Sequence, residues 1–205
     1  MANYNRGVKL PPSVLGTTEI HALLAQFNTR YFTGMRDLTM IVIMWRSQLR
    51  TQEVLDLRAE DIDHDASTIT VQHGKGDKFR VVGMDQQTSL QIREWQAFIR
   101  ERDRHATDGR LFFCHGGKPV RPGDLRNKIR RLAKKAGITK RVHLHGLRHT
   151  GASELAREGV PIPVISQQLG HTSMVTTHRY LSRIAPQEVI AVMRRRIWRP
   201  VASSK

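Results

Sequence analysis

The segment from His145 to Tyr180 holds side chains that could carry out chemistry on a phosphodiester. His145, Arg148 and His149 are spaced i, i+3 and i+4, and these positions share one face of a helix. A guanidinium group binds two phosphate oxygens at once, and an imidazole donates a hydrogen bond or moves a proton near neutral pH. Tyr180, nine residues after His171, could supply an oxygen nucleophile that forms a covalent intermediate. The pattern therefore predicts phosphoryl transfer without a metal ion.

This segment resembles the signature of the tyrosine recombinase (phage integrase) family, which consists of His-x-x-Arg, a Leu-Gly-His turn and a tyrosine. Two further parts of the signature lie upstream. Arg50 begins an Arg-x-x-Glu motif that ends at Glu53, and Lys75 lies in Gly-Lys-Gly-Asp-Lys-Phe-Arg (residues 74–80), which is similar to the family's β-hairpin with its catalytic lysine. The resemblance covers Leu15 to Ala191, nearly the whole chain. Gln48 stands where the family usually has glycine, and we expect a local backbone adjustment there without lost chemistry.

The resemblance implies how the strand would be cut. Tyr180 would attack the phosphorus and leave a 3′-phosphotyrosyl bond, which stores the energy of the phosphodiester so that a second strand can attack without ATP. Lys75 would give a proton to the departing 5′ oxygen. His145 and His171 would donate hydrogen bonds to the phosphoryl oxygens or assist deprotonation of the tyrosine.

The resemblance also implies how charge would be handled. Arg50 and Arg148 would bind the non-bridging oxygens of the scissile phosphate and neutralise the charge that grows in the transition state. Glu53 and His149 would orient Arg50 and the surrounding pocket. The implied activity is site-specific cleavage and rejoining of DNA in integration, excision or inversion, with no metal or other cofactor.

The charge of the chain favours a nucleic-acid partner. Lys and Arg number 34 against 18 acidic residues, which gives a net charge of +16, and such an excess indicates an anionic partner, with double-stranded DNA the first candidate. The alternative is a basic protein of the ribosomal kind. The residues expected to contact DNA are Lys78 and Arg80 in the hairpin and Arg126, Lys128, Arg130, Arg131, Lys134 and Lys135 on a later helix.

The location expected from the sequence is the cytoplasm, for a protein encoded by a bacterium or a phage, in association with the nucleoid when DNA is bound. Cys114 is the single cysteine, so no internal disulfide can form. The longest apolar run, Met40 to Trp45, is far too short to cross a bilayer, and the first six residues lack the apolar region of a signal peptide. We expect no membrane partner.

The apolar patterns predict a mixed fold, mainly helical with a small antiparallel β-sheet. A helix should start after Thr18. A second helix should bury one stripe and present Arg50 directly at its end; the stripe consists of Leu38, Ile41, Val42, Trp45 and Leu49. The β-branched runs 67–72 and 79–82 predict a hairpin, and Leu111 to Phe113 a short strand. Ile92, Trp95 and Ile99 mark another amphipathic helix.

The second half of the chain predicts five more helices, one of which carries Tyr180. Leu125, Ile129, Leu132 and Ala136 form the apolar stripe of a basic helix. The helix after His145 should end at Gly159. Pro161 and Pro163 should open a short helix with Ile162, Ile165 and Leu169 inward, which Gly170 stops. The last helix is expected over Pro186 to Ile197.

We expect three parts in the chain: an extended lead-in at 1–16, the catalytic domain at 17–185, and a C-terminal helix and tail at 186–205. The tail could dock on a neighbouring subunit, linking a homotetramer on two DNA sites, or pack on its own domain; we favour the first, with a monomer in solution. The core-binding domain of most relatives is expected to be absent. The chain would then be a short form, resembling fimbrial-switch DNA invertases, or a fragment of an integrase, and would bind DNA weakly.

Three alternatives stay open at this point. His143, His145 and His149 could ligate a metal, although no carboxylate or cysteine joins them at a usual spacing. A type IB topoisomerase would use the same tyrosine chemistry only to relax supercoils. A non-catalytic DNA-binding regulator would not need the tyrosine at all.

Overall fold

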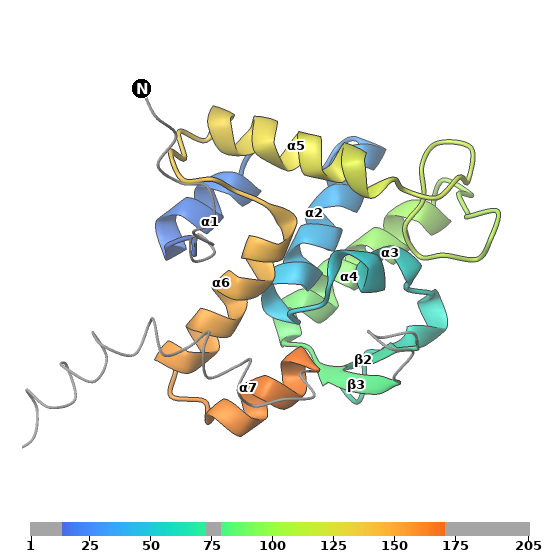
Figure 1. Ribbon diagram of the computed structural model, residues 1–205. Coiled ribbons are helices and arrows are strands. Elements are labelled where there is room, and N and C mark those ends of the chain that lie inside the picture. The colour runs from blue at the N-terminus through green and yellow to red at the C-terminus, as the bar shows by residue number, and fades with distance from the viewer. Residues whose placement is uncertain (1–13, 73–78, 171–205) are drawn as a thin grey trace, which may run out of the picture.

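The structure, a computed structural model, describes residues 14–72 and 79–170 (Figure 1). The predictions made for Lys75, Lys78, His171, Tyr180 and the helix at 186–197 fall outside these residues. The described elements are α1 (Thr17–Leu24), α2 (Phe32–Arg46), α3 (Thr51–Asp56), the 3-10 helix η1 (Ala59–Asp61), β1 (Ile62–Asp63), β2 (Thr68–Val71), β3 (Arg80–Gly83), α4 (Gln86–Arg100), α5 (Pro122–Lys135), α6 (Leu144–Arg157) and α7 (Ile162–Leu169). The predicted class, mainly helical with a small antiparallel sheet, is confirmed.

Helix α2 lies at the centre of the molecule, between α4 and α6 (Figure 1). Because neighbours cover it on both sides, Met40, Ile43 and Met44 are buried as fully as Ile41. The buried surface of α2 is therefore wider than the single apolar stripe that was predicted. Val42 and Trp45, which belong to that stripe, are only partly buried. The helix also ends at Arg46, earlier than the pattern predicted.

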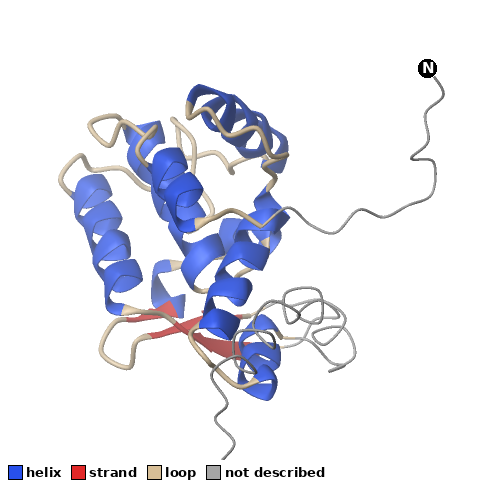
Figure 2. Ribbon diagram, turned by 90° about the vertical axis from the view of Figure 1, so that its left-hand side faces the viewer, coloured by secondary structure: helices blue, strands red, loops and turns tan. Residues whose placement is uncertain are grey.

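The three strands form an antiparallel sheet in the order β1-β2-β3, and β2 pairs with β3 over Thr68↔Gly83 to Val71↔Arg80. This confirms the predicted hairpin strands. The sheet lies at one end of the molecule, with α7 beside β3, and α5 crosses the opposite end (Figures 1 and 2). The strand predicted at 111–113 is wrong: only an isolated bridge joins Phe113 to Pro119. Residues 111–113 are buried, and burial accounts for their apolar character without pairing in a sheet.

Two separate apolar clusters hold the helices. The larger cluster contains residues from α1 to α6 and the sheet. The smaller one joins α6 to α7 through Ala152, Ile165 and Leu169. Ile162 is 37% exposed, so the prediction that it points inward is wrong, because α7 packs along one narrow side only. Within 14–72 and 79–170, no helix has the length and apolar character needed to span a bilayer.

The two helix ends predicted at glycines, those of α6 and α7, are confirmed. Gly159, with φ of 83°, follows α6, and Gly170, with φ of 59°, ends α7 in the left-handed conformation. Helix α1 begins at Thr17, two residues before the start expected at Glu19, since the Glu19 carboxylate accepts a hydrogen bond from the Gly16 N–H at 2.7 Å. Just before it, the Leu15 N–H donates to Thr150 Oγ1 at 3.1 Å, which fastens residues 14–16 to α6.

Candidate active site

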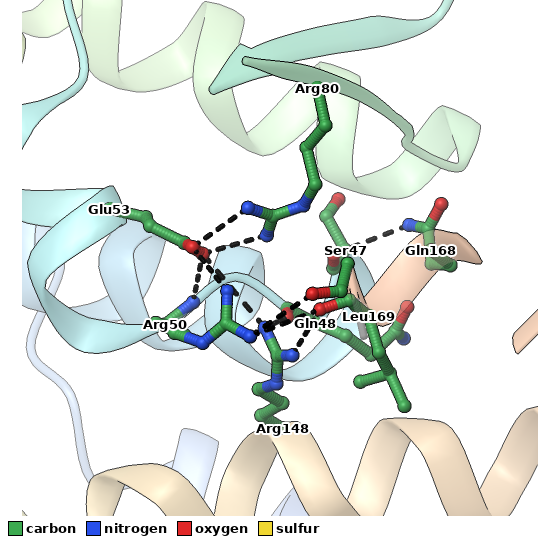
Figure 3. A network of polar contacts seen from close by, with 9 residues as sticks. Ser47, Gln48, Arg50, Glu53, Arg80, Arg148, Gln168 and Leu169 are labelled. Carbon is green, nitrogen blue, oxygen red and sulfur yellow. Dashed lines mark hydrogen bonds and ion pairs between the residues drawn. The ribbon is translucent and has the colours of Figure 1, made fainter. Parts of the chain in front are cut away.

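The two predicted arginines meet at the C-terminal end of α7 (Figure 3). Arg148, on α6, has a side chain that is only 2% exposed. Its Nη1 donates to the Gln48 carbonyl at 2.5 Å, and its Nη2 donates to the Leu169 carbonyl. Arg50 Nη2 approaches the same Leu169 oxygen at 3.5 Å and the Gly170 carbonyl at 3.4 Å. Chain segments about a hundred residues apart thus bring two guanidinium groups to one oxygen atom.

Glu53 holds Arg50 in place. One carboxylate oxygen accepts the Arg50 backbone N–H at 2.7 Å and the other accepts Arg50 Nη1 at 2.7 Å. Arg148 Nη1 lies 3.9 Å from the carboxylate, and the Glu53 side chain is 3% exposed. Burial alone would raise the pKa of Glu53, but hydrogen bonds from Arg80 and from the Arg50 N–H outweigh it and lower that pKa to about 2. The carboxylate is therefore charged throughout the physiological range.

Gln48 turns the chain between α2 and α3. Its φ of 52° is left-handed, a conformation that glycine adopts without strain. The expectation that glutamine at this position costs no chemistry stays a prediction. The Gln48 Nε2 donates to the carbonyls of Trp45 at 3.0 Å and Arg46 at 2.6 Å, which caps the end of α2. The backbone carbonyl of Gln48 is then left to bind Arg148.

A close approach of α6 to α2 sets Arg148 beside Gln48. A Cβ atom added to Gly151 would lie 1.8 Å from the Trp45 carbonyl oxygen, a distance that no side chain can tolerate. The glycine at this position therefore allows the backbones to touch. Arg148 lies one turn earlier on the same helix, so the packing of Gly151 determines where its guanidinium reaches.

The histidines at the start of α6 have distinct surroundings. The rings of His145 and His149 lie edge to face, with centroids 4.3 Å apart. Burial, and then the positive charge of Arg148, lower the pKa of His145, which favours a neutral imidazole able to accept a proton. His143 caps α6, since its Nδ1 accepts the Gly146 N–H at 2.7 Å. No three His, Cys, Asp or Glu side chains of residues 14–72 and 79–170 lie close enough together to hold a metal ion.

Apart from Lys78, which lies outside the described residues, the residues predicted to contact DNA divide into two groups. Five are exposed on α5: Arg126, Arg130, Arg131, Lys134 and Lys135. Lys128 instead points inward, where its Nζ lies 2.5 Å from Asp37 Oδ2. Arg80 likewise binds Glu53. A DNA contact by Lys128 or Arg80 stays a prediction, but each already has an acidic partner within the protein.

Sequence reasoning missed a side chain that joins three elements of the site. Gln168, on α7, accepts the Gly83 N–H at 3.0 Å and donates to the Gly83 carbonyl at 2.8 Å. It also donates to the Ser47 carbonyl at 3.3 Å (Figure 3). Its amide therefore pairs with the free edge of β3 as a neighbouring strand would. A glutamine on a short helix carries no sequence signal for this role.

Comparison with known proteins decides the family. Residues 13–185 match the family described as "Phage integrase family". The chain belongs to the phage integrase family. Among its relatives, a protein named "Tyrosine recombinase" from Thermosipho africanus is 32% identical over 177 residues, which cover 86% of this chain and 59% of that protein. "Tyrosine recombinase XerD" from Staphylococcus saprophyticus is 31% identical over 170 residues, 82% of this chain and 57% of that protein.

Solved structures of the phage integrase family share the fold. The crystal structure of XerA recombinase superposes with a TM-score of 0.78 at 29% identity, over 93% of this chain and 68% of that one. The catalytic domain of bacteriophage HP1 integrase, at 22% identity, gives a TM-score of 0.60 over 89% of this chain and 94% of that domain. This chain spans about half to three fifths of the length of the curated relatives that it matches.

Proposed function

We propose that this chain is the catalytic part of a site-specific DNA recombinase that cuts and rejoins strands through a 3′-phosphotyrosine at Tyr180. The observation that carries the proposal is the convergence of Arg50 and Arg148 on the Leu169 carbonyl, with one buried carboxylate, Glu53, between them. The two guanidinium groups carry two positive charges and the carboxylate carries one negative charge, so this pair of arginines keeps a net positive charge that attracts an anion. Guanidinium donors also match the oxygens of a phosphodiester. Relatives named tyrosine recombinase support the same reading.

In the proposed reaction the Tyr180 oxygen forms a bond to phosphorus while the bond from phosphorus to the 5′ oxygen breaks. Arg50 and Arg148 bind the two non-bridging oxygens, where negative charge grows. Lys75 gives its proton to the departing 5′ oxygen, so that a 5′-hydroxyl is released. Attack by the 5′-hydroxyl of another strand reverses the step and frees the tyrosine. The phosphodiester bond is conserved, so the proposed cycle consumes no ATP.

His145 is suited to receive the tyrosine proton. Its pKa is lowered by burial and by the neighbouring Arg148, so the imidazole is neutral and keeps a lone pair near pH 7. The edge contact with His149 restricts the orientation of the ring. We assign to His171 a hydrogen bond to a phosphoryl oxygen.

We propose that the exposed basic face of α5 binds the backbone of double-stranded DNA. Its five exposed cations, Arg126, Arg130, Arg131, Lys134 and Lys135, lie along one helix whose other face is buried through Leu125 and Ile129. We further propose that the protein is a monomer when free and a homotetramer on two DNA sites. Integration, excision and inversion are the outcomes this arrangement would serve.

A covalent-trapping experiment tests the proposed function. The protein is incubated with a pool of randomised nicked duplexes, in which the cleaved end diffuses away, and the products are separated in SDS. The wild-type chain should give an SDS-resistant protein–DNA band and Tyr180→Phe should give none. Tyr31→Phe is the matched control, because Tyr31 is an exposed tyrosine at the start of α2, and its band should persist. A band from Tyr180→Phe, or none from the wild type at low salt, would contradict the proposal.

A further inference from the structure

Arg80 faces the interior of the protein. Its Nη1 lies 2.8 Å from Glu53 Oε1 and its Nη2 lies 2.8 Å from Glu53 Oε2, a bidentate pair (Figure 3). The side chain is 14% exposed, and its Nε is buried without a hydrogen-bond partner among the described residues. Arg80 shares its side of β3 with the buried Val82, whereas Phe79 and Val81 are exposed. Both Nη atoms of Arg80 are therefore paired with a charged carboxylate, whereas those of Arg148 donate to backbone carbonyls, which carry no net charge.

We propose that Arg80 is a positioning residue for Arg50 and does not bind DNA. The inference rests on the proposed function, because Arg50 is assigned there to the scissile phosphate. Arg80 acts through Glu53: it occupies both carboxylate oxygens, so the single negative charge is divided between two guanidinium groups. The Arg50 guanidinium is thereby held by one carboxylate oxygen, through Nη1, and keeps most of its positive charge for the phosphate.

Removal of Arg80 would change the balance of charge around Arg50. Three arginines surround Glu53, at 2.7 Å for Arg50, 2.8 Å for Arg80 and 3.9 Å for Arg148. Without Arg80, the freed carboxylate oxygens would find their partners in Arg50 and Arg148, the two groups that must receive the phosphate. A buried carboxylate that has lost one partner binds the remaining ones more tightly. The expected result is a weaker and displaced anion site.

Arg80 also supports the other partner of Arg50. A Cβ atom added to Gly170 would lie 2.6 Å from both Cδ and Nε of Arg80, so the arginine stem packs directly beneath this left-handed residue. The Gly170 carbonyl in turn accepts a hydrogen bond from Arg50 Nη2 at 3.4 Å. One side chain of β3 therefore contacts both the carboxylate and the helix end that orient Arg50.

The decisive test separates cleavage from DNA binding in Arg80→Met. A positioning role predicts a loss of about 10- to 100-fold in the single-turnover rate of covalent adduct formation. The Kd for duplex DNA should stay within about threefold and its salt dependence should not change. A DNA contact predicts the reverse: a weaker Kd, and a slope of log K against log salt reduced by about one. Arg93→Met, which removes an exposed arginine of α4, is the charge-matched control and should leave both quantities unchanged.

Two further variants distinguish positioning from general damage to the fold. Arg80→Lys keeps the charge but loses the two-pronged geometry, so its cleavage rate should lie between those of the wild type and Arg80→Met. In the double variant Arg80→Met/Glu53→Gln the unbalanced carboxylate is gone. It should cleave no more slowly than Arg80→Met alone, because both changes act on one contact. Losses that multiply across the two changes would overturn the proposal.

A readout that does not depend on activity keeps the proposal separate from the proposed function. In ¹⁵N spectra of arginine side chains, the Arg50 guanidinium signal, assigned with Arg50→Lys, should shift in Arg80→Met and stay unchanged in Arg93→Met. If the wild type forms no covalent adduct, the proposed function fails while this shift still decides whether Arg80 sets the environment of Arg50. An unshifted Arg50 signal would overturn the inference whatever the activity.

Discussion

Replacing Glu53 by glutamine tests the electrostatic account of the arginine pair. The pKa of this carboxyl is about 2 in the folded protein, against an ordinary value of 4.5. The difference corresponds to roughly 3 kcal/mol of folding stability. Because the folded-state pKa is the lower one, this contribution is fully present above pH 4.5 and is lost as the pH falls toward 2. Glu53→Gln keeps the shape without the charge, so it should lower the free energy of unfolding by about 3 kcal/mol near pH 6.

The pH dependence of that loss is the sharper part of the test. Urea unfolding of both proteins can be followed by the fluorescence of tryptophan, since Trp95 is fully buried. Between about pH 6 and about pH 3.5, the difference between wild type and Glu53→Gln should shrink by roughly 1 kcal/mol, because the carboxyl of the unfolded wild-type chain takes up a proton while that of the folded protein stays ionised. Glu60→Gln, which removes an exposed carboxylate of η1, should change stability by no more than about 0.5 kcal/mol. A difference for Glu53→Gln below about 1 kcal/mol, or one that is equal at both pH values, would refute the reasoning.

Three further predictions concern the packing of α6, the cations of α5 and the protonation of His145. Gly151→Ala should lower the free energy of unfolding by about 1 to 3 kcal/mol and slow cleavage, because the new methyl group forces α6 away from α2; an unchanged urea midpoint would contradict this. Lys128→Met should destabilise the protein by leaving Asp37 buried without this partner, whereas Arg131→Met should weaken DNA binding with little change in stability. If both variants lost the same amount of stability and of DNA affinity, Lys128 and Arg131 would not differ in role as buried and exposed cations of α5. His145 takes up a proton less readily when folded, because its pKa is lowered, so the free energy of unfolding should fall as the pH drops below about 6.5. His145→Gln should lose part of that dependence, and an identical pH profile would count against the burial of this ring.

The sequence contained enough information to predict that two basic residues point toward the interior of the protein. Alternation along the predicted strand 79–82 places Arg80 on the same side as Val82, and Val82 is buried. On α5, Lys128 lies three residues after Leu125 and four before Leu132, within the apolar stripe itself. Periodicity could therefore have identified both side chains as facing the protein. They were predicted to contact DNA because only their basic residue type was considered.

The partners of these residues could not be predicted in the same way. Asp37 lies 91 residues from Lys128 in the chain, and the Leu169 carbonyl that binds both arginines is a backbone atom common to every residue type. Patterns in a sequence report which face of an element is buried, but not which distant element covers it. The predicted strand at 111–113 failed for the same reason, since its apolar residues record burial without recording hydrogen bonding.

The small apolar cluster under α7 has a consequence for local stability. This helix is attached to α6 through a few buried residues separate from the main core, and Ile162 and Val164 on its other side are exposed. Much of its attachment is therefore polar, through the arginines that bind the Leu169 carbonyl and the Gln168 amide that binds β3. Elements with few buried apolar contacts open locally at lower free energy than the core does. The backbone amides of α7 should exchange with deuterium well before those of α2, and anions that compete for guanidinium groups should accelerate the exchange of α7 while α2 stays protected.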